Sequence, residues 1–274
     1  MKQDNTNINQ FVKLQNSKKK LLTPGPASLL VENLIGIEPC FGRGDLKYEK
    51  VETTVLNALK KISGHKKIVR LQGSASFALE VMILNFLSGN ILVVKTGVYS
   101  DRIYKMCVFA KKNFKNIKKI EYIDWKKINN YNGKANWILA CYVETSVGLK
   151  LPIKELYNLK KRLKCKLALD ATASIGLEKN HKFADIIGYS SCKGLFGLTG
   201  AGFISFNDYP KNKINSFNLD FQNHKDKKMT GPYHAICSLV NVLKNHNKFK
   251  QSVIINKNKI LKEMSKHLVL KKKY

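Results

Sequence analysis

The sequence lacks an apolar run long enough to cross a membrane as a helix, and its first twenty residues contain no apolar signal core. Its six cysteines include no CxxC pair, which is typical of reduced, mostly buried thiols rather than of a disulfide framework or a zinc site. We therefore expect a cytoplasmic protein that has no membrane partner and no metal ion.

Acidic residues and arginines are scarce. Asp and Glu together number 19 against 49 Lys and Arg, which gives a net charge of +30, and arginine occurs at four positions. A nucleic-acid-binding protein would concentrate such charge in a patch or tail interleaved with aromatic residues, whereas these lysines lie along the whole chain beside Asn and Ile. We therefore expect no nucleic-acid partner. The positive field would instead attract small anionic molecules.

The sequence also shows no internal repeat and no clear interdomain linker. Its 274 residues, of which 44% are hydrophobic, suffice for one large α/β domain or two small ones. Apolar runs alternate with helical periodicity, which predicts a mostly parallel sheet with helices on both faces. The expected strands are 67–71, 90–95, 117–123, 137–143, 167–169, 184–189 and 202–206. The expected helices are 48–64, 77–87, 98–110, 153–163, 231–243 and 252–268.

An acid and a lysine follow two of these strands. Asp170 ends the run LALD, and Lys193 comes just after the run ADIIGYSS, before a segment of regularly spaced glycines. Ligands in open α/β sheets bind beyond the carboxyl ends of the strands, so the two side chains can meet in one pocket. Pyridoxal phosphate (PLP) catalysis uses such a pair, because the lysine forms a Schiff base and the acid keeps the pyridine nitrogen protonated. The alternative is that Asp170 caps a turn and Lys193 is a solvated lysine, and in a Lys-rich chain the pair alone favours this alternative.

A turn of small residues separates the strand 67–71 from the helix 77–87. The residues are Gly73, Ser74, Ala75 and Ser76, and the helix that follows them is apolar nearly all round, so we expect it to be buried. Free backbone N–H groups and the helix dipole make such a turn an anion site, to which two serine hydroxyls add donors. An ordinary turn between a strand and a helix has the same appearance, so both interpretations stay open.

Six segments, taken together, carry a resemblance to a known family. The sequence resembles the class V aminotransferases, which are PLP enzymes of fold type I, and among them the 2-aminoethylphosphonate–pyruvate transaminases. The resemblance extends from about residue 21 to 267. It implies the major domain of fold type I, a mostly parallel sheet with helices on both faces, and PLP as cofactor. The matching segments are LLTPGP, LQGSASFALE, TGVYSDR, YVETSVGL, LALDATAS and YSSCKGLFGLTGAG.

The resemblance assigns the catalytic pair. Lys193 would carry the Schiff base and, once the substrate frees it, move a proton between the amino acid and the cofactor. Asp170 would pair with the pyridinium nitrogen, so that the ring can withdraw electrons from the reacting carbon. Tyr99 would stack on the ring. The phosphate group would be bound at the turn formed by Gly73, Ser74 and Ala75.

The resemblance also implies contacts at the edge of the site. Thr145 would reach the edge of the ring near its phenolic oxygen, and Ser190 would contact the ring or the phosphate. Thr230, in the segment MTGPYH, matches a threonine that reaches the phosphate bound by the partner subunit. We therefore expect a homodimer whose active sites lie at the interface.

The implied reaction moves an amino group from 2-aminoethylphosphonate to pyruvate, giving phosphonoacetaldehyde and alanine, a step of phosphonate metabolism. Two alternatives are another class V aminotransferase, such as an alanine–glyoxylate enzyme, and a shortened, non-catalytic protein with the PLP fold.

The resemblance also implies a division of the chain. Residues 1–20 would form a loose arm, 21–210 the PLP-binding major domain, and 211–274 a helical extension that begins a truncated small domain. The amino donor and the 2-oxo acid acceptor would both be small molecules.

One expectation concerns the anchor for the substrate's anionic group. The family's arginine for this task lies in the C-terminal small domain, which would begin where this chain stops, and the residue before the lysine, often Asn or Gln, is Cys192 here. The hypothesis is that Arg43, in the loop CFGRGD, binds the substrate, because a guanidinium fits phosphonate and carboxylate groups. Alternatively, Arg43 forms a loop salt bridge with Asp45. Arg70 lies within a strand, Arg102 follows Tyr99 on a helix and Arg162 is on a Lys-rich face, so these three are weaker candidates.

Overall fold

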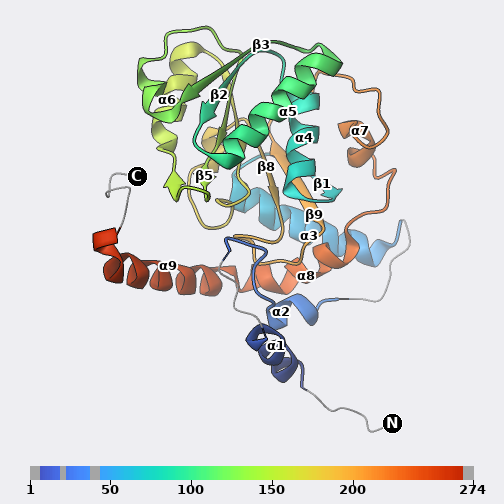
Figure 1. Cartoon of the computed structure of the whole chain (residues 1–274). Coiled ribbons are helices and arrows are strands. Elements are labelled where there is room, and N and C mark those ends of the chain that lie inside the picture. Colours follow the sequence, from blue (N-terminus) through green and yellow to red (C-terminus); the bar gives the residue numbers. More distant parts are fainter. Residues whose placement is uncertain (1–6, 19–22, 38–43, 268–274) are drawn as a thin grey trace.

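A seven-stranded sheet runs through the molecule, and helices cover both of its faces (Figure 1). The computed structural model describes residues 7–18, 23–37 and 44–267. The strand order is β1-β9-β8-β7-β4-β2-β3, and every neighbouring pair is parallel except the two that involve β9. The predicted mostly parallel sheet is thus confirmed. The strands are β1 (Lys67–Gln72), β2 (Gly89–Lys95), β3 (Ile117–Asp124), β4 (Trp137–Cys141), β7 (Lys166–Asp170), β8 (Ile186–Ser190) and β9 (Ala201–Phe206).

The central strands are continuous apolar runs because they are covered on both faces. All five residues of β4 and all five of β8 are buried. A smaller hairpin follows β4, in which β5 (Val143–Glu144) pairs with β6 (Leu149–Lys150). It leads into α6 (Ile153–Leu163), whose observed bounds match the predicted helix.

One face of the sheet is covered by α4 (Ala75–Phe86), α5 (Val98–Phe114) and the short α7 (Phe221–Lys225). Helix α4 packs on β8 and β9 with one side, while α5 and α7 cover its other sides. This double cover explains why α4 is apolar nearly all round, and its predicted burial is confirmed. The first turn of α4 consequently lies beside the carboxyl ends of the central strands.

The opposite face is covered by α3 (Leu46–Ser63), α6 and α8 (Tyr233–Lys244). The amphipathic α3 packs against α8, and its buried residues Val55 and Leu59 belong to the same hydrophobic core as Leu239 of α8. The long α9 (His246–Glu263) follows and runs along the base of the molecule in Figure 1. The remaining helical segments are α2 (Val31–Leu34), η1 (Trp125–Asn130), η2 (His181–Phe183) and η3 (Ser265–His267).

The N-terminal arm differs from the expectation. Residues 8–17 form the helix α1 (Ile8–Ser17), so the prediction of a loose arm is wrong for this part. The side chain of Asn7 caps the helix by accepting a hydrogen bond from the N–H of Asn9 at 2.9 Å, and the helix buries Val12. A second difference is that α9 begins at His246 rather than at 252, because no Gly or Pro interrupts the chain after α8. The domain boundaries at 20 and 210 stay predictions.

No helix in the described ranges is both long and apolar enough to cross a membrane.

Candidate functional site

The carboxyl ends of β7 and β8 lie side by side and carry the two predicted catalytic residues. Asp170 is the last residue of β7, Ser190 is the last residue of β8, and Lys193 follows three residues later. Together with the β1–α4 turn they line a pocket of about 460 Å³, which we call the Lys193 pocket. The structure therefore brings together most of the predicted site, namely Gly73, Ser74, Ala75, Tyr99, Asp170, Ser190 and Lys193.

Asp170 is a buried acid that forms no ion pair with any of the described residues. It is 5% exposed, and its Oδ1 accepts a hydrogen bond from the N–H of Thr172 at 2.9 Å. Burial raises the pKa of Asp170, and the hydroxyl and N–H of Thr172, together with the charge of Lys193, oppose the effect only in part. A positively charged group in the pocket would therefore stabilise the carboxylate.

Lys193 extends along the face of an aromatic ring. Its Nζ lies 5.3 Å from the centroid of the Tyr99 ring. Its stem passes the TPGP loop so closely that a Cβ on Gly25 would lie 2.6 Å from its Cγ. The N–H of Ala27 donates to the carbonyl of Cys192 at 2.8 Å and fixes this loop beside the lysine. Residues 23–26, the described part of this segment, are thus linked to the site by a close contact that only glycine permits.

The β1–α4 turn presents backbone donors to the pocket. Ser74 caps α4, since its Oγ accepts from the N–H of Phe77 at 3.2 Å, and the N–H of Gly73 donates to Gly200 at 2.9 Å. The N–H groups of Ala75 and Ser76 donate to no other group in the described part of the chain. The positive end of the α4 dipole and these free donors are the features with which helix starts bind anions.

Arg102 reaches this turn from α5. Its Nη1 donates to the Oγ of Ser76 at 3.2 Å, and its Cζ lies 5.2 Å from the centroid of the Tyr99 ring. Arg102, a weaker candidate in the sequence, also lines the Lys193 pocket. The signal in the sequence was its spacing from Tyr99, because residues three apart on a helix share a face.

Glu144 positions Tyr99 and was not predicted as part of the site. This fully buried carboxylate accepts hydrogen bonds from the N–H groups of Tyr99 and Ser100, at 3.2 and 3.1 Å, and from the hydroxyl of Thr96 at 3.1 Å. It therefore caps α5 from the neighbouring strand and fixes the turn that carries the aromatic ring. Thr145, the next residue, is half-buried and does not line the Lys193 pocket.

Thr172 presents two groups to the acid of the site. Its N–H donates to Oδ1 of Asp170, and its buried hydroxyl lies close enough to the carboxylate to lower the pKa of Asp170, without a well-aligned hydrogen bond. The residue also lines the Lys193 pocket.

Two predicted residues lie elsewhere. Thr230 is exposed and lines a separate pocket on the other side of the β1–α4 turn. Its predicted contact with a partner subunit stays a prediction. Arg43 lies outside the described residues.

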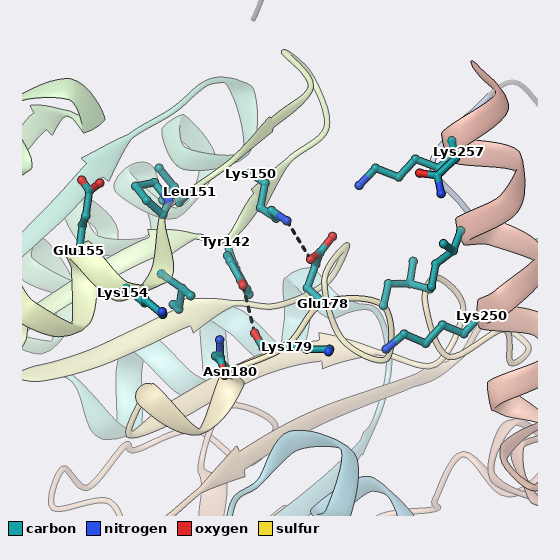
Figure 2. A pocket seen from close by; sticks show the side chains of 15 residues that line it. Tyr142, Lys150, Leu151, Lys154, Glu155, Glu178, Lys179, Asn180, Lys250 and Lys257 are labelled. Carbon is teal, nitrogen blue, oxygen red and sulfur yellow. Dashed lines mark hydrogen bonds and ion pairs between the residues drawn. The ribbon is translucent and has the colours of Figure 1, made fainter. Parts of the chain in front are cut away.

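A third pocket is larger but contains none of the predicted site residues. It has a volume of about 640 Å³ and lies between the start of α6, the loop 177–180 and α9. Figure 2 shows Lys250 and Lys257 pointing into it from α9, opposite the ion pair of Lys150 with Glu178, whose Nζ–Oε2 distance is 3.2 Å. Its lysines are a solvated, charged face.

In the described part of the chain no cluster of three or more His, Cys, Asp or Glu side chains could hold a metal ion.

Solved structures define the class of protein to which this fold corresponds. The chain aligns with the aspartate aminotransferase of subgroup IV from Thermus thermophilus with a TM-score of 0.74 and 19% identity, over 85% of this chain and 72% of that one. The pyridoxamine–pyruvate aminotransferase from Mesorhizobium loti gives a TM-score of 0.72 and 18% identity, over 85% and 66%. The fold is therefore that of the fold type I aminotransferases.

Sequence comparison is more specific. The chain is similar to the 2-aminoethylphosphonate–pyruvate transaminase of Pseudomonas aeruginosa, with 27% identity over 197 residues, which are 67% of this chain and 53% of that protein. It is 25% identical to the enzyme of that name from Pseudomonas putida over 253 residues, 83% of this chain and 68% of that protein. The chain thus spans about half the length of the first of these relatives. No protein-family model matches it.

Proposed function

We propose that the Lys193 pocket binds pyridoxal 5′-phosphate and that the protein is an aminotransferase. The observation that carries the proposal is the meeting of Asp170 and Lys193, from the ends of two neighbouring strands, beside an anion-binding helix start at Ala75. When bound, PLP supplies a ring that withdraws electrons from the substrate carbon. The likeness to named transaminases supports the same function.

The residues present fit this group. The free N–H groups of Ala75 and Ser76, with Arg102 beside them, suit a phosphate. The buried carboxylate of Asp170 suits a protonated ring nitrogen, because that charge would offset the cost of its burial.

Lys193 would have two tasks. Its Nζ would hold the cofactor covalently and, once the substrate displaces it, would take a proton from the carbon that bears the substrate's amino group. Tyr99 would keep the ring flat by stacking, and Glu144 keeps Tyr99 in place. Each of these residues belongs to a strand end or a helix start, so the site is held rigidly.

For the substrates we propose 2-aminoethylphosphonate as the amino donor and pyruvate as the acceptor. The names of the relatives support this pair, and the positive charge of the chain suits an anionic donor and an anionic acceptor. Arg43 stays the proposed anchor for the donor's phosphonate, Thr145 the proposed contact at the ring edge, and Thr230 the proposed contact with the partner's phosphate in a homodimer.

The decisive experiment uses purified protein incubated with PLP and then with borohydride. We expect a yellow protein in which mass spectrometry finds the reduced cofactor on Lys193, and we expect Lys193→Ala to lose the visible band. Lys150→Ala, in the lysine-rich pocket, is the matched control and should keep it. If Lys193→Ala retains a reducible covalent adduct, the assignment of the lysine is wrong.

Turnover assays then test the substrates. The protein is supplied with 2-aminoethylphosphonate and pyruvate, or with alanine and glyoxylate, and the oxo products are measured. Faster turnover of the first pair supports the proposal. Turnover of the second pair alone would favour the alanine–glyoxylate alternative, and cofactor binding without any turnover would favour the non-catalytic one.

A further inference from the structure

A cavity of about 640 Å³ lies beside α9, and none of the residues assigned to the cofactor lines it. We call it the lysine-rich pocket. Its volume is within the range of small-molecule sites. Four segments of the chain, namely β6, α6, the loop 177–180 and α9, supply its five lysines and two glutamates. The lysines are Lys150, Lys154, Lys179, Lys250 and Lys257, and the glutamates are Glu155 and Glu178.

Positive charge is in excess in this pocket, because the two glutamates do not balance the lysines. Glu178 pairs with Lys150, at 3.2 Å between Oε2 and Nζ. Glu155 accepts a hydrogen bond from Asn129 at 2.9 Å, and in Figure 2 it lies at the end of the pocket away from α9. The other four lysines form no ion pair with any residue that the structure describes.

Three of these four lysines converge from two sides of the pocket. Lys250 and Lys257 are seven residues apart on α9, so they share a helix face, and both point into the pocket (Figure 2). Lys179, in the loop opposite, extends toward Lys250. Like charges that face each other across a gap repel, and Lys250 is half-buried, so water screens it only in part. An anion between the loop and the helix would replace this repulsion by attraction.

The rest of the wall is mainly apolar. Leu151 and Ile153 are buried where α6 begins, and Ile254 adds an apolar side chain from α9, between its two lysines. The start of α6, a helix of 11 residues, also adds the positive end of its dipole. A ligand that fits this pocket therefore carries several negative charges and an apolar part.

We propose that the lysine-rich pocket binds an organic polyphosphate, of the chemical class of a nucleoside triphosphate. Its phosphates lie between Lys179, Lys250 and Lys257, and its organic part contacts Leu151 and Ile254. Lysine is a flexible point charge that suits a chain of phosphates, whereas a single carboxylate is matched best by the paired donors of an arginine. No arginine is among the described residues that line the pocket.

Such a ligand would fasten α9 to the rest of the domain. His246, the first residue of α9, is the one residue of this helix that the described structure buries, and its Nε2 lies 2.8 Å from the carbonyl oxygen of Gly194. Most of the remaining side chains of α9 are exposed. A polyphosphate that bridges Lys250 and Lys257 to Lys179 would add a second attachment, so the amide hydrogens of α9 should exchange more slowly in its presence.

The first arm of the test is calorimetric titration with ATP of the full chain, loaded with PLP and freed of excess cofactor. The double variant Lys250→Gln/Lys257→Gln should bind ATP roughly tenfold or more weakly than the wild type, because two charge-assisted contacts are lost. The matched control is Lys248→Gln/Lys259→Gln. It removes the same charge from α9 at two exposed positions that do not line the pocket, so it should leave the affinity nearly unchanged.

The second arm tests the class of ligand. AMP carries fewer negative charges than ATP and should bind about tenfold more weakly or less tightly still. Ile254→Asn should weaken ATP binding by roughly threefold or more, because it removes the apolar contact, but should leave the binding of tripolyphosphate unchanged. Ile255→Asn is the control for this variant, since Ile255 is 65% exposed and does not line the pocket.

Hydrogen exchange followed by mass spectrometry locates the bound ligand. ATP should slow exchange in α9 of the wild type and of Lys248→Gln/Lys259→Gln, and should have no effect in Lys250→Gln/Lys257→Gln.

Absence of ATP binding would overturn the inference. An equal loss of affinity in the two lysine double variants would overturn it too, because the attraction would then come from the charge of the whole chain. Equal affinities for AMP and ATP would contradict a polyphosphate, and unchanged ATP binding in Ile254→Asn would contradict an organic one. Failure of the proposed function would look different, since the wild-type chain would take up no PLP while the ATP titration still reported on the lysine-rich pocket.

Discussion

At the scale of single residues, Asp170 shows how the site depends on its ligand. Its carboxyl group is buried among strand ends, and burial raises its pKa. An acid whose pKa is higher in the folded than in the unfolded state favours folding at low pH, where it is neutral in both states or in the folded one. This contribution is lost as the pH rises through the pKa of the folded state, because the buried group must then ionise. Without cofactor, the ionised carboxylate therefore costs stability at neutral pH.

We predict that cofactor-free Asp170→Asn melts at a higher temperature than the wild type at pH 7, because the amide has no charge to bury. The difference should shrink as the pH falls into the range where the wild-type carboxyl is protonated. Thermal melts over a pH series measure the difference, and a difference that grows on acidification would contradict the role of burial.

Cofactor-loaded Asp170→Asn should lose activity by about 10²-fold or more, because the amide cannot hold a ring cation.

Thr172 allows a second prediction at this scale. Thr172→Val removes a hydroxyl that lowers the pKa of Asp170, so that pKa should rise further in the cofactor-free protein. The same change should weaken PLP binding, because a carboxyl that ionises less readily pairs less well with a ring cation. Thermal melts over a pH series and cofactor titration measure the two effects. If neither changes, the hydroxyl does not act on the Asp170 carboxylate.

At the scale of elements, a single carboxylate links a strand to a helix. Glu144 belongs to β5 but accepts hydrogen bonds from the first turn of α5, so it couples the strand that follows β4 to the helix that carries Tyr99 and Arg102. The glycine at the start of α5 permits this approach, since a Cβ on Gly97 would lie 2.9 Å from Cδ of Glu144.

We predict that Glu144→Gln lowers the free energy of unfolding by about 1–3 kcal/mol, because an amide N–H would face backbone N–H donors. It should also shift the visible band of the bound cofactor, since Tyr99 would move. Glu155→Gln, in the first turn of α6, is a matched control and should have neither effect. A destabilised variant with an unchanged cofactor spectrum would show that Glu144 supports the fold but does not position Tyr99.

The elements that could be predicted from the sequence are the ones with strong local signals. The runs WILAC and LALD indicate buried strands, and the amphipathic pattern from Ile153 predicts α6 correctly.

The pocket formed by Asp170, Lys193 and Gly73 was predictable because all three residues come at the ends of predicted strands. The separate pocket lined by Arg70 and Thr230 was not predictable, since it depends on residues 218–230 lying beside β1, and no local pattern encodes that contact. α7 was missed because five residues are too few to show a helical period. α1 was missed although its apolar residues lie on one face, because its ten residues stand among long polar stretches.

At the scale of the whole molecule, two features are compatible with a larger assembly. Thr230 is exposed at a pocket separate from Lys193, and α9 exposes apolar side chains along its length. The most exposed of these are Ile255, Ile260 and Leu261, and the exposed Met264 follows directly after the helix.

We predict that the cofactor-loaded protein is a homodimer. Light scattering should give twice the chain mass of 31.1 kDa. Thr230→Val should weaken PLP binding about tenfold, because it removes one hydrogen bond to a charged phosphate. A monomer with full cofactor occupancy would contradict this prediction and with it the assignment of Thr230.

The position of β9 beside β1 in the sheet also affects how the protein is made. β1 lies at the edge of the described sheet, where β9 is its neighbour, and Lys67 pairs with Phe206. On the ribosome, β1 emerges long before β9, so the nascent chain must keep an apolar strand unpaired while most of the domain is translated. The N–H of Gly73 gains its acceptor at Gly200 only at that late stage. PLP present during translation would therefore find no complete pocket until the glycine segment has left the exit tunnel.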